Sequence, residues 1–213
     1  MINVIRKIHS ADCFLQRHRF GDARILNVGS SNTSFGHNCI NVDIQNKVGI
    51  DCRCDAHRLA FRDSTFDIVL ITAVLQYCVD PPRVVLELSR VLKPNGLLYV
   101  DAPLVQPYCP DTPDLFRFTK HGLIKLFQNE FIIEECDTSI PAGSALAFYI
   151  QALVATTSLG NRYINYVFVF FISLLIFPLS IVNFNKNHHV AGALYLVGRN
   201  SKNIDRKHRD ITI

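Results

Sequence analysis

Two short apolar runs of the sequence end at residues that could contact a ligand. Gly29 follows the run 24–28, and Asp43 closes the run 39–43. Short apolar runs bounded by turn residues are typical of buried parallel strands, and ligands of such sheets bind at the carboxyl ends of the strands. There Gly29 would let a ligand approach the backbone, and the Asp43 carboxylate could accept both hydroxyls of a ribose. An ordinary strand-ending glycine and a solvated aspartate are the alternatives.

The elements that must position these residues alternate along the chain. Pro81 and Pro82 fit the start of a helix, and Pro94-Asn95-Gly96 fits its end. Strands that alternate with helices imply an α/β fold with a parallel sheet and right-handed crossovers. The 213 residues suit a single domain, 1–213. The predicted strands are 24–28, 39–43, 48–52, 66–72, 96–102, 131–136 and 190–198, and the predicted helices are 1–20, 81–92 and 119–128.

Four segments in this order resemble one family. They are Ile25-Leu-Asn-Val-Gly-Ser-Ser, Asn41-Val-Asp-Ile, Asp55-Ala-His-Arg-Leu-Ala-Phe-Arg-Asp-Ser-Thr-Phe-Asp and Arg90-Val-Leu-Lys-Pro-Asn-Gly-Leu-Leu-Tyr-Val. Together they resemble the class I S-adenosylmethionine-dependent methyltransferases, in particular the small type 11 group with its D-A-x-x-L-P-F-x-D-x-x-F-D and R-V-L-K-P-G-G patterns. The resemblance covers about residues 24–126. It implies a Rossmann-like, mostly parallel sheet with an antiparallel last strand, and S-adenosylmethionine as the cofactor.

The resemblance implies that the turn after the first strand contacts the methionine end of the cofactor. The family pattern there is D/E-x-G-x-G-x-G, of which this chain keeps only Gly29. Asn27 stands where the acid is expected, Ser31 replaces the second glycine and Thr33 replaces the third. Gly29 and Ser31 are the predicted contacts in this turn. The degenerate pattern also supports an alternative, a relative that has lost cofactor binding.

The resemblance further assigns contacts to the adenosine. Asp43 would bind the ribose, and Asp55 matches the acid that reaches the exocyclic amine of adenine. Ala56 and His57 would supply backbone contacts, and Val74 would wall the adenine pocket. A simple turn aspartate and a surface histidine are the alternatives for Asp55 and His57.

The segment after the fifth predicted strand is the expected acceptor site. The cofactor carries most of the reactivity in methyl transfer, so the protein must mainly position the acceptor, with a base needed only for a hydroxyl. The segment resembles the family's H-x-x-D-x-x-R-F-T pattern, with Asp114, Arg117 and Thr119 matching. Tyr108, Asp111 and Asp114 are the candidate acceptor-binding or catalytic residues. The alternative pairs Asp114 with Arg117 and makes Thr119 a helix cap.

Residues 138–185 form a hydrophobic insertion between the last two predicted strands. Arg162 is its only charged residue, and the runs 138–161 and 163–185 each approach the ~20 residues of a bilayer-spanning helix. The break between the two runs predicts a helical hairpin, which returns the chain to its own sheet. Membrane insertion is favoured over a dimer interface or an enlarged core, because the second run is apolar on every face. The pattern does not distinguish a hairpin that crosses the membrane from one that dips into it.

Composition restricts the function classes. The net charge of +4 is too small and scattered to indicate nucleic-acid binding. Seven cysteines without secreted or metal-ligand spacing favour a reduced cytosolic compartment and no metal site, and the first twenty residues do not resemble a signal peptide. A nicotinamide-binding enzyme is disfavoured, because no G-x-G-x-x-G follows the first strand.

We therefore expect a methyltransferase on the cytoplasmic side of a membrane that methylates a small or lipid-linked acceptor, preferably on oxygen. The alternative is a non-catalytic, membrane-anchored partner protein. The sequence leaves the oligomeric state open.

Overall fold

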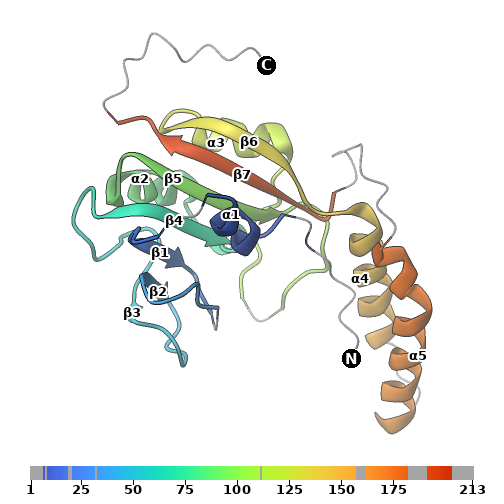
Figure 1. The fold of residues 1–213 in the computed structure, drawn as a ribbon. Coiled ribbons are helices and arrows are strands. Elements are labelled where there is room, and N and C mark those ends of the chain that lie inside the picture. The colour runs from blue at the N-terminus through green and yellow to red at the C-terminus, as the bar shows by residue number, and fades with distance from the viewer. Residues whose placement is uncertain are drawn as a thin grey trace.

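The computed structural model describes residues 7, 9–18, 21–31, 33–110, 112–156, 162–181 and 191–202. Its described part contains a seven-stranded sheet with the order β3-β2-β1-β4-β5-β7-β6 (Figure 1). Strand β7 is antiparallel to β5 and β6, and the other neighbouring strands are parallel, which confirms the predicted fold class. The strands are β1 (Ile25–Val28), β2 (Cys39–Asp43), β3 (Cys52–Arg53), β4 (Phe66–Thr72), β5 (Leu92–Pro103), β6 (Phe131–Ile140) and β7 (Ala193–Asn200).

Helices cover both faces of the sheet (Figure 1). Successive residues of β4 point to opposite faces, so Val69 packs with α2 and α3 while Ile68 packs with α1. Burial on both faces explains why β4 reads as a continuous apolar run. The helices in the described residues are α1 (Ala11–His18), the 3-10 helix η1 (Leu75–Tyr77), α2 (Pro81–Val91), α3 (Lys120–Phe127), α4 (Ala142–Ala155) and α5 (Arg162–Ile181).

Several predicted boundaries were wrong. The fifth strand was expected at 96–102, but β5 begins at Leu92, so Pro94-Asn95-Gly96 lies within β5 and does not end α2, whose last residue is Val91. Two further differences concern the third strand and the insertion. The third strand was expected at 48–52, but β3 pairs only at Cys52 and Arg53, while Val48 is exposed in a turn with Gly49 at φ +89°. The insertion was expected to begin at Thr138, but β6 continues to Ile140 because its last residues pair with β7. Both differences arise from strand pairing that no local pattern records.

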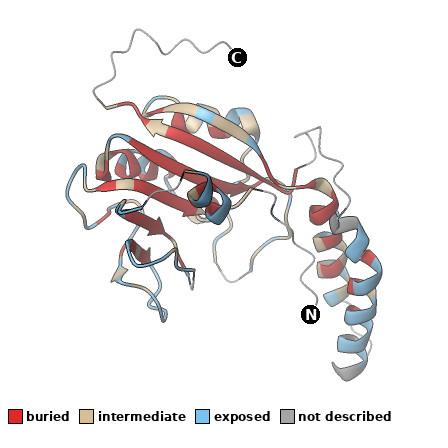
Figure 2. Ribbon diagram, in the orientation of Figure 1, coloured by how far each residue is buried: buried red, intermediate tan, exposed pale blue. Residues whose placement is uncertain are grey.

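Helices α4 and α5 lie between β6 and β7 in the chain and project from one end of the sheet (Figures 1 and 2). They pack on each other through Ala147 and Ile176. Residues 157–161, which include most of the predicted break between them, lie outside the described residues. Within the part of the chain that the structure describes, no helix combines the length and apolarity needed to cross a membrane. Membrane insertion stays a prediction.

Candidate cofactor and acceptor site

The carboxyl ends of β1, β2 and β4 meet at one edge of the sheet. Val28, at the end of β1, lies in register with Val42 of β2 and Ile71 of β4. The backbone N–H groups of Gly29 and Ser30 donate to the Val42 carbonyl at 2.8 and 3.0 Å. The turn after β1 is therefore fastened to the end of β2.

Gly29 and Val74, both predicted cofactor contacts, lie against each other. Gly29 has φ +68°, and a Cβ added to it would lie 2.1 Å from Cγ2 of Val74. The packing of Val74 thus requires a glycine here. That Gly29 also leaves room for the cofactor stays a prediction. The Ser30 hydroxyl, one residue on, is buried without a hydrogen-bond partner among the described residues.

Asp43 joins the ends of the first two strands. Its Oδ2 accepts from the Ser31 N–H at 3.0 Å and its Oδ1 from the Gln45 N–H at 2.9 Å, so the carboxylate lies beside Ser31, as predicted for a shared site. Each carboxylate oxygen keeps a second lone pair and can accept a ligand hydroxyl. The chemistry of this carboxylate therefore fits a ribose.

Asp55 lies near Asp43, because the N–H of the intervening Cys54 donates to the Asp43 carbonyl at 2.9 Å. The Asp55 Oδ1 accepts from the backbone N–H of His57 at 2.9 Å and contacts His57 Nδ1 at 2.7 Å. Burial alone would raise the pKa of Asp55, but these hydrogen bonds outweigh it and hold the pKa below its usual value. Ala56, between them, packs against the core.

The tautomer of His57 follows from its neighbours. Its Nε2 accepts from the Asp80 backbone N–H at 3.2 Å, so the ring proton lies on Nδ1 and is donated to Asp55. Asp80 also caps α2, where its side chain accepts from the Arg83 N–H at 3.2 Å. Asp55 and His57 are therefore tied to the start of α2, and Asp55 keeps an exposed carboxylate.

Two residues that the sequence motifs did not indicate as site residues, Glu87 and Arg90, hold the Asp55 loop in place. Glu87 accepts from the Leu59 N–H at 2.9 Å, and Arg90 donates to the carbonyls of Leu59 at 2.8 Å and Phe61 at 2.7 Å. Glu87 and Arg90 are themselves paired at 2.8 Å. Arg90 begins the R-V-L-K-P pattern and Leu59 belongs to the D-A-H-R-L-A-F pattern, so co-occurrence of the two patterns was the available signal.

Hydrogen bonds attach the acceptor loop, residues 104–119, to several neighbouring elements. The N–H groups of Leu115 and Phe116 donate to the Gln76 carbonyl at 2.8 and 3.2 Å. The N–H groups of residues 104 and 105 donate to the Gly192 carbonyl at 3.0 and 2.9 Å, next to β7. On α4, the Tyr149 hydroxyl donates to the Gln106 carbonyl at 2.8 Å. The loop therefore joins η1, β7 and α4.

The candidate catalytic residues of this loop are placed differently from one another. The side chain of Asp114 is fully buried and forms a two-pronged pair with Arg117, with Nη2 to Oδ2 at 2.6 Å. This hydrogen bonding lowers the pKa of Asp114, so the carboxylate is a weak base. Thr119 caps α3 by accepting from the Gly122 N–H at 3.1 Å. The predicted pair and cap are therefore present, and a catalytic role of Asp114 stays a prediction. Tyr108 is exposed, and Asp111 lies outside the described residues.

Gln76 is a further site residue that the sequence did not indicate as a contact. It is fully buried, and its Nε2 donates to the Ala73 carbonyl at 2.9 Å. Its Oε1 has no hydrogen-bond partner in the described part of the chain. With the Ser30 hydroxyl, it places a second unpaired polar atom at the strand ends. These atoms and Asp43 fit a polar ligand such as S-adenosylmethionine.

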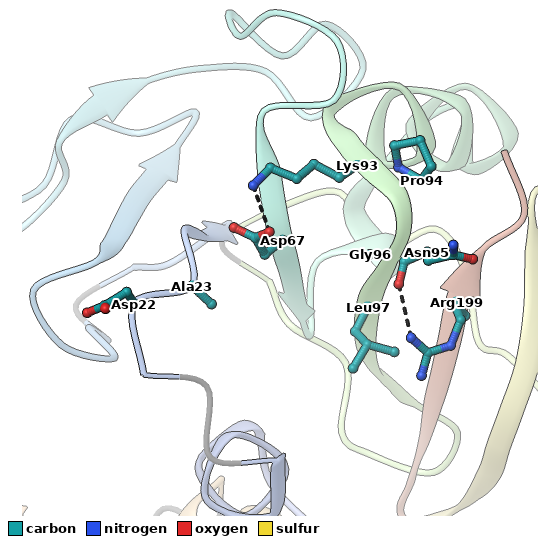
Figure 3. Close-up of a pocket in the computed structure, with 9 residues that line it drawn as sticks. All are labelled: Asp22, Ala23, Asp67, Lys93, Pro94, Asn95, Gly96, Leu97 and Arg199. Carbon is teal, nitrogen blue, oxygen red and sulfur yellow. Dashed lines mark hydrogen bonds and ion pairs between the residues drawn. The ribbon is translucent and has the colours of Figure 1, made fainter. Parts of the chain in front are cut away.

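A separate depression of about 500 Å³ lies at the opposite edge of the sheet (Figure 3). It is lined by residues near the amino ends of β4 and β5. Asp67 pairs there with Lys93 at 2.7 Å, and Arg199 donates to the Asn95 carbonyl at 3.0 Å. Its location separates it from the strand ends that carry Asp43 and Gly29.

Comparison with known proteins identifies the kind of domain that the sequence motifs resemble. A family model described as a methyltransferase domain matches residues 28–100. The ubiquinone/menaquinone biosynthesis C-methyltransferase UbiE of Desulfotalea psychrophila is 29% identical over 121 residues, covering 55% of this chain and 48% of its own length. The chain spans less than half the length of the curated relatives it matches.

Two solved structures show the same fold. A S-adenosylmethionine-dependent methyltransferase from Archaeoglobus fulgidus is 12% identical with a TM-score of 0.54, over 89% of this chain and 92% of that one. The [4+2]-cyclase SpnF is 18% identical with a TM-score of 0.57, over 89% and 79%. The matched segment holds the first turn, Asp43, Asp55 and most of β5, the residues that form the strand-end site. Residues 28–100 of this chain therefore match a methyltransferase domain, and the fold around them is that of S-adenosylmethionine-dependent methyltransferases.

Proposed function

We propose that this protein transfers the methyl group of S-adenosylmethionine to a small or lipid-linked acceptor, preferably at a hydroxyl, on the cytoplasmic face of a membrane. The observation that carries the proposal is the acceptor loop, which binds the strand-end site through Gln76 and the apolar helix α4 through Tyr149. An acceptor held by this loop would lie between the cofactor and the apolar helices.

The geometry of the last three strands supports this arrangement. Pro103, at the end of β5, and Ile140, at the end of β6, both pair with Ala193 of β7. The two ends therefore lie at the same edge of the sheet, and α4 begins there at Ala142. The apolar helices leave the sheet on the side of the cofactor site. UbiE, whose name places it in ubiquinone synthesis, offers a precedent for a lipid acceptor, although its name specifies methylation at carbon.

We assign a role to each site residue from its contacts and its position. Bound S-adenosylmethionine supplies a methyl group activated by a sulfonium. Asp43 would bind the ribose hydroxyls of the cofactor and Asp55 its adenine amine, and these contacts would hold the cofactor in place for transfer. Asp114 holds the loop closed through Arg117. Tyr108 and Asp111 remain the candidates to bind the acceptor or take its proton.

Calorimetric titration of the detergent-purified protein with S-adenosylhomocysteine tests the cofactor site. We expect the parent to bind, and Asp43→Asn and Asp55→Asn each to weaken binding at least tenfold. Asp22→Asn is the matched control, because Asp22 lines the depression at the opposite edge of the sheet. Equal affinities for all four proteins would contradict the assigned site.

A second test addresses the acceptor. Protein incubated with S-adenosylmethionine carrying a labelled methyl group and with a membrane lipid extract should move label into the lipid fraction. Mass spectrometry of the product then distinguishes a methyl ether from a new carbon–carbon bond. Label found only in the water-soluble fraction would contradict a lipid-linked acceptor.

The alternative function is a non-catalytic, membrane-anchored partner protein. Two observations favour it: Val74 occupies the space beside Gly29, and the turn keeps one glycine of the family pattern. The cyclase SpnF also shows that this fold supports other activities. A well-folded parent that fails to bind S-adenosylhomocysteine would favour this alternative.

A further inference from the structure

Much of helix α5 is exposed (Figure 2). Many of its exposed residues carry large apolar side chains. Phe171, Leu174 and Leu175 keep 61%, 54% and 74% of their surfaces accessible. In a water-soluble protein, a contiguous apolar patch of this kind marks a contact surface. The exposed large apolar residues of this helix are Ile164, Tyr166, Val167, Phe168, Phe170, Phe171, Leu174, Leu175 and Phe177.

The angular width of the exposed surface indicates what covers it. Val169, Ser173 and Ile176 form the buried stripe that faces α4. At 3.6 residues per turn, the exposed apolar positions occupy an arc of roughly 200° on the other side. A helix that packs on one neighbour needs an apolar stripe of about 100°. One protein partner would therefore leave much of this arc in water, whereas lipid surrounds a helix on every open side.

The polar side chains between the two helices turn inward. Gln151 Nε2 of α4 donates to the Ser173 hydroxyl at 2.7 Å, and that hydroxyl donates to the Val169 carbonyl at 2.7 Å. Both side chains are buried. Hydrogen bonds of this type join helices in membranes, where an outward polar group would have no partner. Arg162 is the only charged residue of the sequence between positions 138 and 185.

The apolar surface continues from the helices toward the acceptor loop. On α4, Leu146, Tyr149 and Leu153 are exposed at helical spacing and thus share one face. Tyr149 of this face bonds to Gln106 of the loop, and the loop itself exposes Tyr108. Val105, Leu115 and Phe116 of the loop are exposed as well.

We propose that α4 and α5 insert into a lipid bilayer, with α5 as the lipid-facing helix and the acceptor loop at the membrane surface. This inference deepens the proposed function and rests on its membrane location, because it names the bilayer contact of the same site. A lipid-linked acceptor would then enter the loop directly from the bilayer.

Flotation with vesicles tests the inference. The detergent-purified parent, mixed with phosphatidylcholine vesicles or with phosphatidylcholine and phosphatidylglycerol vesicles before detergent removal, should float with both. The triple variant Phe171→Gln, Leu174→Gln, Leu175→Gln should partition into the vesicles about 100-fold less than the parent. Each apolar side chain that would leave water for lipid contributes about fivefold to this partitioning. Glutamine keeps helix propensity and alters only exposed positions.

A matched control removes exposed apolar side chains elsewhere. Val48→Gln, Val79→Gln, Leu86→Gln changes three exposed residues outside α4, α5 and the acceptor loop, and it should float like the parent. The chain has no tryptophan, so Phe171→Trp supplies a single tryptophan whose emission can be followed. Its emission should be quenched by brominated lipid, and that of Val79→Trp should not.

Three results would overturn the inference. They are a parent that stays unbound, a triple α5 variant that floats like the parent, or a vesicle-free dimer that the α5 variant abolishes. The last result would assign the surface to a second copy of the chain. Titration of the same proteins with S-adenosylhomocysteine separates the two proposals, because loss of cofactor binding would contradict the proposed function without affecting the lipid contact.

Discussion

Replacing Arg90 with leucine should remove hydrogen bonds that hold the loop that carries Asp55. The Arg90 guanidinium binds both carboxylate oxygens of Glu87, at 2.9 and 2.8 Å, and the carbonyls of Leu59 and Phe61. The Glu87 side chain is 7% exposed. Arg90→Leu would therefore leave a buried carboxylate with little compensation, and the loop carbonyls would lose their donors.

The expected magnitude is a loss of about 3 kcal/mol in the free energy of unfolding. Removing one partner of a buried ion pair costs ~3–5 kcal/mol, and we take the lower end because Arg90 is 30% exposed and water can replace part of it. A domain of this size loses about 2–4 °C of melting temperature per kcal/mol, so the midpoint should fall by about 6–12 °C. Affinity for S-adenosylhomocysteine should fall with it.

Arg83→Leu is the matched control. Arg83 also pairs with Glu87, but at 3.8 Å and with 53% of its side chain exposed. Exposed pairs contribute less than ~1 kcal/mol. Thermal unfolding followed by circular dichroism, with calorimetric titration of each variant, measures both effects. Equal losses of unfolding free energy for Arg83→Leu and Arg90→Leu would show that Arg90 is not the residue that holds the Asp55 loop.

The pairing of Arg90 with Glu87 also predicts that the stability depends on pH. The hydrogen bond from Arg90 lowers the pKa of Glu87 below its ordinary value of 4.5. A depressed folded-state pKa contributes stability that is present above the ordinary pKa and is lost as the pH falls through the folded-state pKa. The stability difference between parent and Arg90→Leu should therefore be full at neutral pH and shrink below about pH 4.5. A difference independent of pH would show that the ion pair is not its source.

Three further predictions follow from the site. Gly29→Ala should destabilise the protein by at least about 2 kcal/mol, because the new Cβ meets Val74 at 2.1 Å and the backbone is left-handed. Adding Val74→Ala should restore part of this loss. If the unfolding free energies of the two single variants, measured in urea, simply add in the double variant, the contact is contradicted. Asp114→Asn should cost about 2 kcal/mol, because it breaks the pair with Arg117, while leaving affinity for S-adenosylhomocysteine within about twofold; an unchanged melting temperature would argue against the structural role. Thr119→Ala should remove the cap of α3 at a cost of about 1 kcal/mol, and Thr119→Ser should retain most of it, which chemical denaturation can measure.

The sequence by itself determined the order and type of most elements and the identity of the domain. Apolar runs predicted β1, β2, β4 and β5 because each strand is buried on both faces. Pro81 and Pro82 correctly indicated the start of α2. The resemblance assigned Ser31 and Asp43 to one cofactor site, and the structure brings them together, because the carboxyl ends of neighbouring parallel strands lie at one edge. The pairing of Asp114 with Arg117 was also available, since the two residues are close in sequence.

Only the tertiary structure decided how these pieces meet. The contact of Gly29 with Val74, the clamp of Glu87 on Leu59 and the link from Tyr149 to the acceptor loop join residues that are distant in sequence. Hydrophobic periodicity reports which face of an element is buried and does not identify what buries it. The same limit applies to the apolar insertion. Its sequence predicts helices, while the pairing of β5 and β6 with β7 places the start of those helices at the edge of the sheet where β5 ends.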